Sequence, residues 1–310
     1  MRRPLLVLPL VLASALVLAG CAAEETNPEP AETDAASIGV CDAPEGDVAS
    51  AVTVTGDFGA APTVDFADGL EVGETERAVL VEGDEAEPGQ LISAAYALYN
   101  ATTGDLLENF GWVAGEPLTP FRADYDMLAE GFAKTIGCLG VGTRVVGVIP
   151  GAEGFGEAGE QLGISPDDVL LFVVDILSDN VWSTDLPEIG GTEEAPTVTL
   201  VGAPKTDLEI AVLEEGDGEV VGTTGPVTVH YHGTAWETGE VFDQNFDNPA
   251  PQPFPDVQGL VQGFTQALIG QKVGSRVLVT MPPALGYGGQ EGHALQPYTL
   301  VFLIDILDAG

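Results

Sequence analysis

Basic residues are scarce in this chain. Its 310 residues include 9 Lys and Arg against 49 Asp and Glu, a formal net charge of -40 at pH 7. Nucleic-acid binding depends on cations that neutralise phosphates, so this charge excludes nucleic acid as a partner, and anionic lipid headgroups are disfavoured for the same reason. We interpret the acids as a solvated face that keeps the protein soluble. Attraction of basic clients or of calcium is the alternative.

Metal-binding and nucleophilic patterns are also lacking. The chain has 3 His and 3 Cys, and no His lies near Cys41 or Cys138 in the sequence. There is no phosphate-binding loop and no defensible Ser-His-Asp order. His230 and His232 alternate with Tyr231 along an expected strand, so they should face away from it. No third ligand accompanies this pair, so we expect no metal and no cofactor.

A long apolar run is missing as well. Arg2 and Arg3 precede an apolar segment, Leu5 to Val17, which is shorter than the ~20 residues of a membrane span. The following Leu18-Ala19-Gly20-Cys21 resembles a bacterial lipobox. Residues 1–21 are therefore expected to be a lipoprotein signal peptide, with Cys21 lipidated and the protein held on the membrane without spanning it. A plain secretory signal is the alternative.

The next segment, residues 22–40, is acidic and has almost no large apolar side chain. Such a composition cannot bury enough surface to fold, so it predicts a disordered, extended tether. Cys41 and Cys138 remain as an even pair in an exported chain, and we expect them to form a disulfide. Two buried free thiols are the alternative.

The folded part repeats itself. At a separation of 132 positions, Gly131-Phe132 matches Gly263-Phe264, and Gly142-Thr143-Arg144-Val145 matches Gly274-Ser275-Arg276-Val277. At 135, Tyr96 matches Tyr231, and at 130 the run 172–177 matches 302–307. Ala61-Pro62-Thr63-Val64 also echoes Ala195-Pro196-Thr197-Val198. These matches indicate a tandem duplication, and the drifting separations mark small loop insertions.

Each copy combines one short helix with several strands. Helical periodicity predicts helices over 127–136 and 261–269, each followed by glycine. Runs rich in Val, Ile and Thr predict strands in the second copy at 208–213, 227–231, 276–281 and 299–307. The pattern indicates an α+β class. We expect one domain over 41–180, a Gly- and Pro-rich linker over 181–205 and a second domain over 206–310.

The second copy carries a recognisable order of motifs. These are Val229-His230-Tyr231-His232-Gly233, Gly239-Glu240-Val241-Phe242-Asp243, Leu260-Val261-Gln262-Gly263-Phe264, Pro282-Pro283-Ala284-Leu285-Gly286-Tyr287-Gly288 and Thr299-Leu300-Val301-Phe302. The order resembles the FKBP family of peptidyl-prolyl cis-trans isomerases. The resemblance implies two tandem FKBP-like domains, each a bent antiparallel sheet wrapped over a short helix.

The resemblance also implies a site. Tyr231, Asp243 and Tyr287 would be catalytic: Tyr287 donating to the substrate carbonyl, Asp243 accepting from Tyr231. Phe264 would form the floor, where the family often has Trp, and the backbone N–H of Val261 would anchor the peptide. The substrate-binding set is Phe242, Phe254, Leu260, Val261, Phe264 and Phe302. The family's long loop is shortened at 289–297.

The first copy differs at this site. Leu107 stands for Phe242, Glu108 for Asp243 and Phe155 for Tyr287. Phe155 cannot donate a hydrogen bond, so we expect weak or no catalysis there.

The sequence thus predicts a lipid-anchored isomerase that assists the folding of exported, proline-containing polypeptides at the outer face of the bacterial cell membrane. The resemblance adds macrolide inhibitors as ligands. A proline-binding chaperone or adaptor that needs no turnover is the alternative.

Overall fold

The computed structural model describes residues 41, 43–67, 69–113, 118–123, 128–155, 159, 163–248 and 250–310. The expected signal peptide, with Cys21, and the tether over 22–40 lie outside these residues. Within them, no helix combines the length and apolar character needed to cross a membrane.

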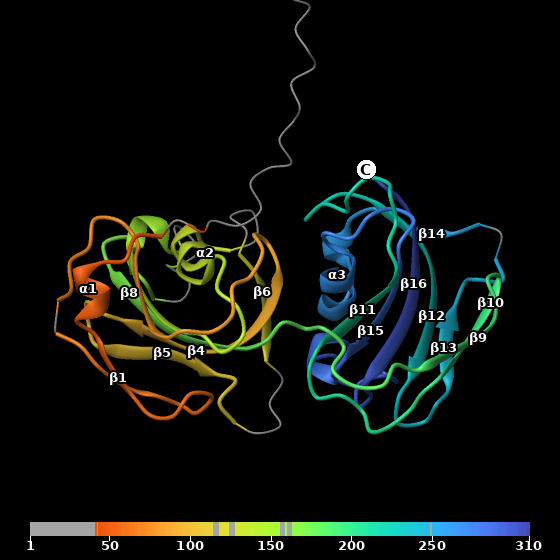
Figure 1. Ribbon diagram of the computed structural model, residues 1–310, viewed down its shortest axis with the longest axis horizontal. Coiled ribbons are helices and arrows are strands. Elements are labelled where there is room, and N and C mark those ends of the chain that lie inside the picture. Colours follow the sequence, from red (N-terminus) through yellow and green to blue (C-terminus); the bar gives the residue numbers. More distant parts are fainter. Residues whose placement is uncertain are drawn as a thin grey trace, which may run out of the picture. The chain divides into compact units, whose positions relative to one another are not determined.

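The first domain is built on a bent antiparallel sheet with the strand order β3-β7-β8-β4-β5, and β6 pairs with β4. The strands are β3 (Glu76–Val81), β4 (Leu91–Asn100), β5 (Asp105–Phe110), β6 (Thr119–Arg122), β7 (Arg144–Pro150) and β8 (Val169–Ser178). The helix α2 (Glu130–Ile136) packs on one face of this sheet, where Phe132 and Ile136 join the buried core (Figure 1). A short 3-10 helix, η1 (Gly151–Glu153), follows β7.

The second domain repeats this arrangement. Its sheet has the order β11-β15-β16-β12-β13, with β14 paired to β12. The strands are β11 (Glu209–Glu214), β12 (Val227–Ala235), β13 (Val241–Gln244), β14 (Gln252–Phe254), β15 (Arg276–Met281) and β16 (Leu300–Ala309). The helix α3 (Gln262–Leu268) lies within the curve of this sheet (Figure 1). The 3-10 helix η3 (Val257–Gly259) precedes α3, and the 3-10 helix η4 (Pro283–Leu285) follows β15.

The two sheets agree residue by residue in register. Tyr96 pairs with Val174 in the first, and Tyr231 pairs with Ile304 in the second. These pairs reproduce the sequence separations of 135 and 130. The α+β fold of two tandem domains is confirmed. The predicted strand over 276–281 coincides with β15. The helix expected over 127–136 is observed from Glu130, and Met127 lies outside the described residues.

A β-hairpin covers the second face of each sheet. In the first domain, α1 (Asp47–Ser50) precedes β1 (Thr53–Thr55) and β2 (Thr63–Asp65), and Val54 and Val64 pack on Val146 and Val173. These sheet residues alternate with the residues that face α2, because successive side chains point to opposite faces. Both sheet faces are therefore apolar and both are covered.

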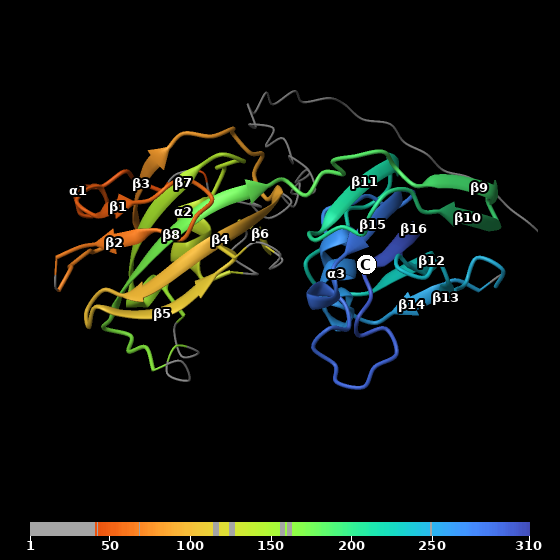
Figure 2. The ribbon, with the colours of Figure 1, turned by 90° about the horizontal axis from the view of Figure 1, so that it is seen from below.

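The corresponding hairpin of the second domain lies in the segment that we expected to be only a linker. Residues 181–205 contain β9 (Glu188–Thr192) and β10 (Ala195–Thr199), which pair with each other. Ile189 and Val198 pack with Trp236 and Leu303; Figure 2 shows this hairpin from a second side. Gly190, Gly191 and Pro196 suggested a loop, but they lie in a two-stranded hairpin, where such residues are tolerated.

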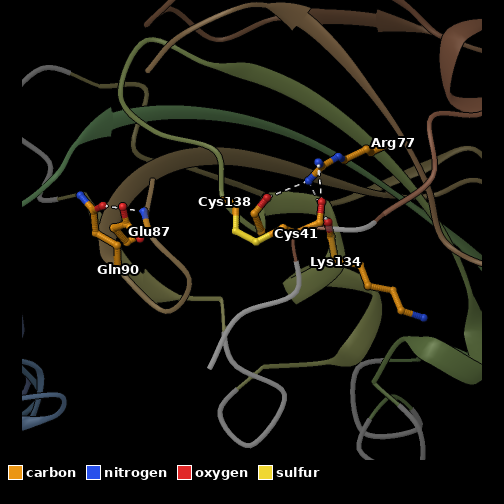
Figure 3. The surroundings of a disulfide bond; sticks show 7 residues. Cys41, Arg77, Glu87, Gln90, Lys134 and Cys138 are labelled. Atoms are coloured by element: carbon orange, nitrogen blue, oxygen red, sulfur yellow. Dashed lines mark hydrogen bonds between the residues drawn. A yellow bond between two sulfur atoms is a disulfide. The ribbon is translucent and has the colours of Figure 1, made fainter. Parts of the chain in front are cut away.

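A disulfide joins Cys41, at the start of the described chain, to Cys138, just after α2, with their Cα atoms 5.0 Å apart. Arg77 on β3 reinforces this junction (Figure 3). Its guanidinium donates to the carbonyl oxygens of Cys41, at 3.1 Å, and Gly137, at 2.8 Å. The disulfide therefore ties the incoming chain to the end of the helix.

Each sheet also holds an equivalent ion pair. Arg144 contacts Asp175 in the first domain, and their side chains are 4% and 0% exposed. Arg276 contacts Asp305 in the second, and these side chains are 18% and 21% exposed. Arg144 also donates to the carbonyl oxygens of Gly56 and Asp57, between β1 and β2. The buried pair therefore fixes the first hairpin on its sheet.

Candidate active site

A cavity of about 470 Å³ opens in the second domain, between α3, the inner face of the sheet and the segments after η3 and η4. All nine residues expected from the sequence line it: Tyr231, Phe242, Asp243, Phe254, Leu260, Val261, Phe264, Tyr287 and Phe302. Gly259, Gly286 and Gln290 complete the lining. Sequence reasoning missed these three, although Gly286 lies inside a quoted motif. The catalytic and binding roles of the nine residues remain predictions.

Aromatic rings form the floor and wall of this cavity. The ring of Phe264, on α3, has its centroid 4.9 Å from that of Phe302 on β16, and the two rings are nearly perpendicular. Phe242 meets Phe302 at 5.4 Å in the same edge-to-face manner, and Tyr231 meets Phe264 at 6.2 Å. Edge-to-face packing is a preferred arrangement of aromatic pairs, so the rings hold one another in place and leave an apolar hollow.

Gly233 makes this packing possible. It lies on β12, opposite Phe302 on β16 and Asp243 on β13. A Cβ atom at this position would lie 2.6 Å from Cζ of Phe242 and 2.8 Å from Cε1 of Phe302. Carbon atoms in contact are about 3.5–4.0 Å apart, so only glycine leaves room for both rings. The sequence showed Gly233 in a motif but gave no reason for it.

A single carboxylate marks the polar edge of the cavity. The Tyr231 hydroxyl donates to Oδ2 of Asp243 at 2.7 Å. Burial, the hydrogen bond to Asp243 and the charge of Asp243 together raise the pKa of Tyr231 well above its usual range, because each disfavours the phenolate. Asn245 fixes the strand beneath, since its Oδ1 accepts from the Tyr231 backbone N–H at 2.6 Å. Tyr231 is therefore a neutral donor committed to Asp243.

Tyr287, after η4, lies against a histidine. Its ring stacks on that of His293, with centroids 4.0 Å apart and planes 10° apart. Nδ1 of His293 accepts from the Leu295 backbone N–H at 3.2 Å, which fixes the imidazole within its loop. Among the described residues, the Tyr287 hydroxyl has no hydrogen-bond acceptor. It remains free to donate to a ligand in the cavity.

Val261 lies at the entrance of α3 and caps this helix with an extended backbone, φ -65° and ψ 145°. The helix thus begins one residue later than predicted. Within the described chain, the backbone N–H of Val261 has no acceptor. The first N–H groups of a helix lack intrahelical partners, so this group can anchor the carbonyl of a bound peptide.

The two histidines of β12 lie outside this site, as their alternation with Tyr231 predicted. His232 is buried, and burial lowers its pKa from the ordinary value of 6.5. The ring of His230 packs edge-on against Phe246. No cluster of three or more His, Cys, Asp or Glu arranged for a metal occurs among the residues that the structure describes.

Comparison with known proteins places this site in a family. The model of the family described as FKBP-type peptidyl-prolyl cis-trans isomerase matches residues 219–307. All the residues that line the cavity of the second domain lie in this range. A structure of three FKBP domains from wheat aligns with 76% of this chain and 94% of its own, at 22% identity and a TM-score of 0.32. This likeness is too low to support the assignment.

Two bacterial proteins support it. A probable FK506-binding protein of Corynebacterium glutamicum is 41% identical over 118 residues, which cover 37% of this chain and 99% of that protein. An FK506-binding protein of Streptomyces anulatus is 38% identical over 119 residues, covering 37% of this chain and 96% of that protein. With nearly the whole of each relative matched, the chain belongs to the FKBP-type peptidyl-prolyl cis-trans isomerase family.

Proposed function

We propose that the second domain isomerises Xaa-Pro bonds of exported polypeptides at the outer face of the bacterial cell membrane, to which Cys21 anchors the protein through lipid. The observation that carries the catalytic part is the cavity of about 470 Å³ walled by aromatic rings, with one tyrosine paired to a carboxylate. Family membership supports the same activity.

The chemistry needs no nucleophile. A planar prolyl amide is stabilised by resonance that places charge on its carbonyl oxygen, and rotation has a barrier of about 20 kcal/mol. Twisting removes the resonance and leaves a less polar bond. An apolar cavity disfavours the planar, charge-separated form more than the twisted one, so it binds the transition state better than the ground state. The five rings of Tyr231, Phe242, Phe254, Phe264 and Phe302 supply this environment.

The polar groups orient the substrate. Phe264 receives the proline ring, and the N–H of Val261 binds a neighbouring backbone carbonyl. The Tyr287 hydroxyl donates to the carbonyl of the residue before proline. Asp243 holds Tyr231 and sets the polarity at the edge of the cavity. The two bacterial relatives are named for FK506 binding, and we propose that macrolides of this kind occupy the same cavity.

An isomerisation assay on a short peptide, Ala-Leu-Pro-Phe, tests the site. The full chain in sub-stoichiometric amount should accelerate cis-to-trans conversion, and Tyr287→Phe with Asp243→Ala should reduce kcat/KM by at least about 10-fold, since each removes a polar contact worth about 1 kcal/mol. Tyr298→Phe with Asp247→Ala is the matched control, because neither residue lines the cavity. Equal activity of the two double variants would refute the assignment.

Two further experiments test the clients and the location. Refolding of a secreted ribonuclease limited by prolyl isomerisation should accelerate with the wild-type chain and not with the Tyr287 and Asp243 double variant. In bacterial cells, the wild-type chain should fractionate with membranes and carry acyl chains, and Cys21→Ser should release it. A wild-type chain without acyl groups would contradict the proposed anchor.

A further inference from the structure

The first domain holds a second aromatic cavity that sequence reasoning did not assign. It measures about 290 Å³ and is lined by residues from β4, β5, β6, α2 and β8, together with the segments that precede α2 and follow η1. Strand registers match it to the first: Tyr96 stands for Tyr231 and Phe172 for Phe302. Phe121 pairs with Ile92 as Phe254 pairs with Val227.

The aromatic floor is intact in this cavity. Phe132, on α2, lies 4.6 Å from Phe172 and 5.0 Å from Phe121 between ring centroids. Tyr96 lies 5.8 Å from Phe121, edge to face. Burial and a hydrogen bond to Glu108 raise the pKa of the Tyr96 hydroxyl, as burial and Asp243 do for Tyr231. Four rings have therefore been retained, and a carboxylate, Glu108, again lines the cavity together with the tyrosine.

The entrance is retained too. Ala129 caps α2 with φ -55° and ψ 135°, close to the angles of Val261 before α3. Ala129 and Leu128 line this cavity as Val261 and Leu260 line the larger one. The chain therefore enters the helix beside the cavity with a similar extended backbone in both domains.

Two features have changed. Phe155 lines the cavity where Tyr287 lines the other, so the hydroxyl that would bind the substrate carbonyl is gone. Leu98 occupies the register position of Gly233, since each pairs with the phenylalanine of the neighbouring strand. Leu98 is buried and lines the cavity, whereas Leu107, the counterpart of Phe242, is exposed and does not. One leucine on β4 therefore fills the space of one ring and makes the cavity smaller.

We infer that the cavity around Phe132 binds a prolyl residue of a polypeptide without isomerising it, so the chain carries one catalytic and one non-catalytic proline site. This inference rests on the proposed function of the larger cavity, because the shared rings argue for the same occupant. A narrow, ring-lined hollow fits one compact apolar ring better than a long side chain. Two losses act together there: no hydroxyl holds the substrate carbonyl, and Leu98 replaces one ring of the apolar wall. With both gone, binding does not favour the twisted bond over the planar one.

Fluorine NMR on the full chain tests the inference. The probes are Ala-Leu-Pro-(4-fluoro)Phe and, as matched control, Ala-Leu-Ala-(4-fluoro)Phe. Val261→Trp fills the larger cavity and should abolish isomerisation, while saturable broadening of the prolyl probe persists. Adding Ala129→Trp should remove that broadening. In the Val261→Trp chain, the prolyl probe should bind at least about 5-fold more tightly than the alanyl probe.

The other outcomes are separable. Three results would each overturn the inference. The Val261→Trp chain could show no broadening up to millimolar probe, the broadening could survive both substitutions, or the two probes could bind with equal affinity. Isomerase activity that survives both Val261→Trp and Ala129→Trp would overturn the proposed function instead. Activity that survives Val261→Trp but is removed by adding Ala129→Trp would show catalysis in the first domain and overturn the inference. If Ala129→Trp unfolds the first domain, as circular dichroism would show, a photo-leucine version of the prolyl probe is cross-linked to the Val261→Trp chain. Adducts at Phe121, Leu128 or Phe155 support the site, and adducts elsewhere overturn it.

Discussion

Gly233 offers the sharpest test of how the catalytic cavity is built. In a Gly233→Ala variant, the new methyl group would start 2.6 Å from Cζ of Phe242 and 2.8 Å from Cε1 of Phe302. Contact between carbon atoms requires about 3.5 Å, so one or both rings must move by about 1 Å. Such overpacking costs about 1–3 kcal/mol, and the movement displaces two walls of the cavity.

The expected result is a loss of both stability and activity. If transition-state binding suffers by the same about 1–3 kcal/mol, kcat/KM falls by about 5- to 150-fold in the peptide isomerisation assay. Gly289→Ala is the matched control, because a Cβ there meets nothing within 4 Å and Gly289 does not line the cavity; its effect should stay within about 0.5 kcal/mol. Wild-type kcat/KM in Gly233→Ala, with Gly289→Ala also unchanged, would refute the proposed role of the two rings.

Four further predictions follow from single contacts. Tyr287→Phe alone should lower kcat/KM by about 2- to 12-fold, because it removes one neutral hydrogen bond to the substrate. An unchanged kcat/KM in the peptide assay would contradict the proposed role of Tyr287. Burial lowers the pKa of His232 below 6.5, so the unfolded chain takes up a proton first as pH falls. The contribution of His232 to the free energy of unfolding should therefore be fully present above about pH 6.5. Below that pH the free energy of unfolding should decline by at most about 1.4 kcal/mol per pH unit. Denaturant titrations between pH 5.5 and 7 should show this decline, and its persistence in His232→Asn would contradict the cause. The Cys41–Cys138 disulfide spans 97 positions, so its reduction should destabilise the first domain by about 4 kcal/mol in the chain-entropy account; an unfolding curve unaffected by dithiothreitol would contradict it. Arg144→Ala should cost about 3–5 kcal/mol because it leaves the charge of buried Asp175 without its cation. Arg276→Ala, at the more exposed pair, should cost about 1 kcal/mol, and similar costs for the two variants would contradict this comparison.

The sequence predicted the fold more completely than it predicted the packing inside the cavity. The duplication follows from repeat spacing and the strands follow from β-propensity, both of which can be read from the chain itself. The nine lining residues follow from the resemblance of the motif order to the FKBP family. The replacement of Gly233 by Leu98 was missed because its consequence depends on a contact across strands, visible only once Phe242 and Phe302 are placed. The comparison of Phe242 with Leu107 drew attention to the wrong leucine.

The hairpin β9–β10 was missed for a related reason. Its glycines and proline have the composition of a linker, and only its packing on Trp236 and Leu303 shows that it belongs to the second domain. The stacking of His293 on Tyr287 likewise arises from the path of a loop, which the short segment after Tyr287 did not reveal.

The central claim is that the ring-lined cavity of the second domain lowers the barrier to prolyl rotation. Exchange NMR on Ala-Leu-Pro-Phe measures this directly, because it reports interconversion of the two isomers at equilibrium without a coupling enzyme. A trace of the full chain should raise the exchange rate well above the uncatalysed rate of once in about 10–100 s, and Val261→Trp, which fills the cavity, should return it to that value. An exchange rate that the wild-type chain leaves unchanged, or that Val261→Trp leaves accelerated, would contradict the account.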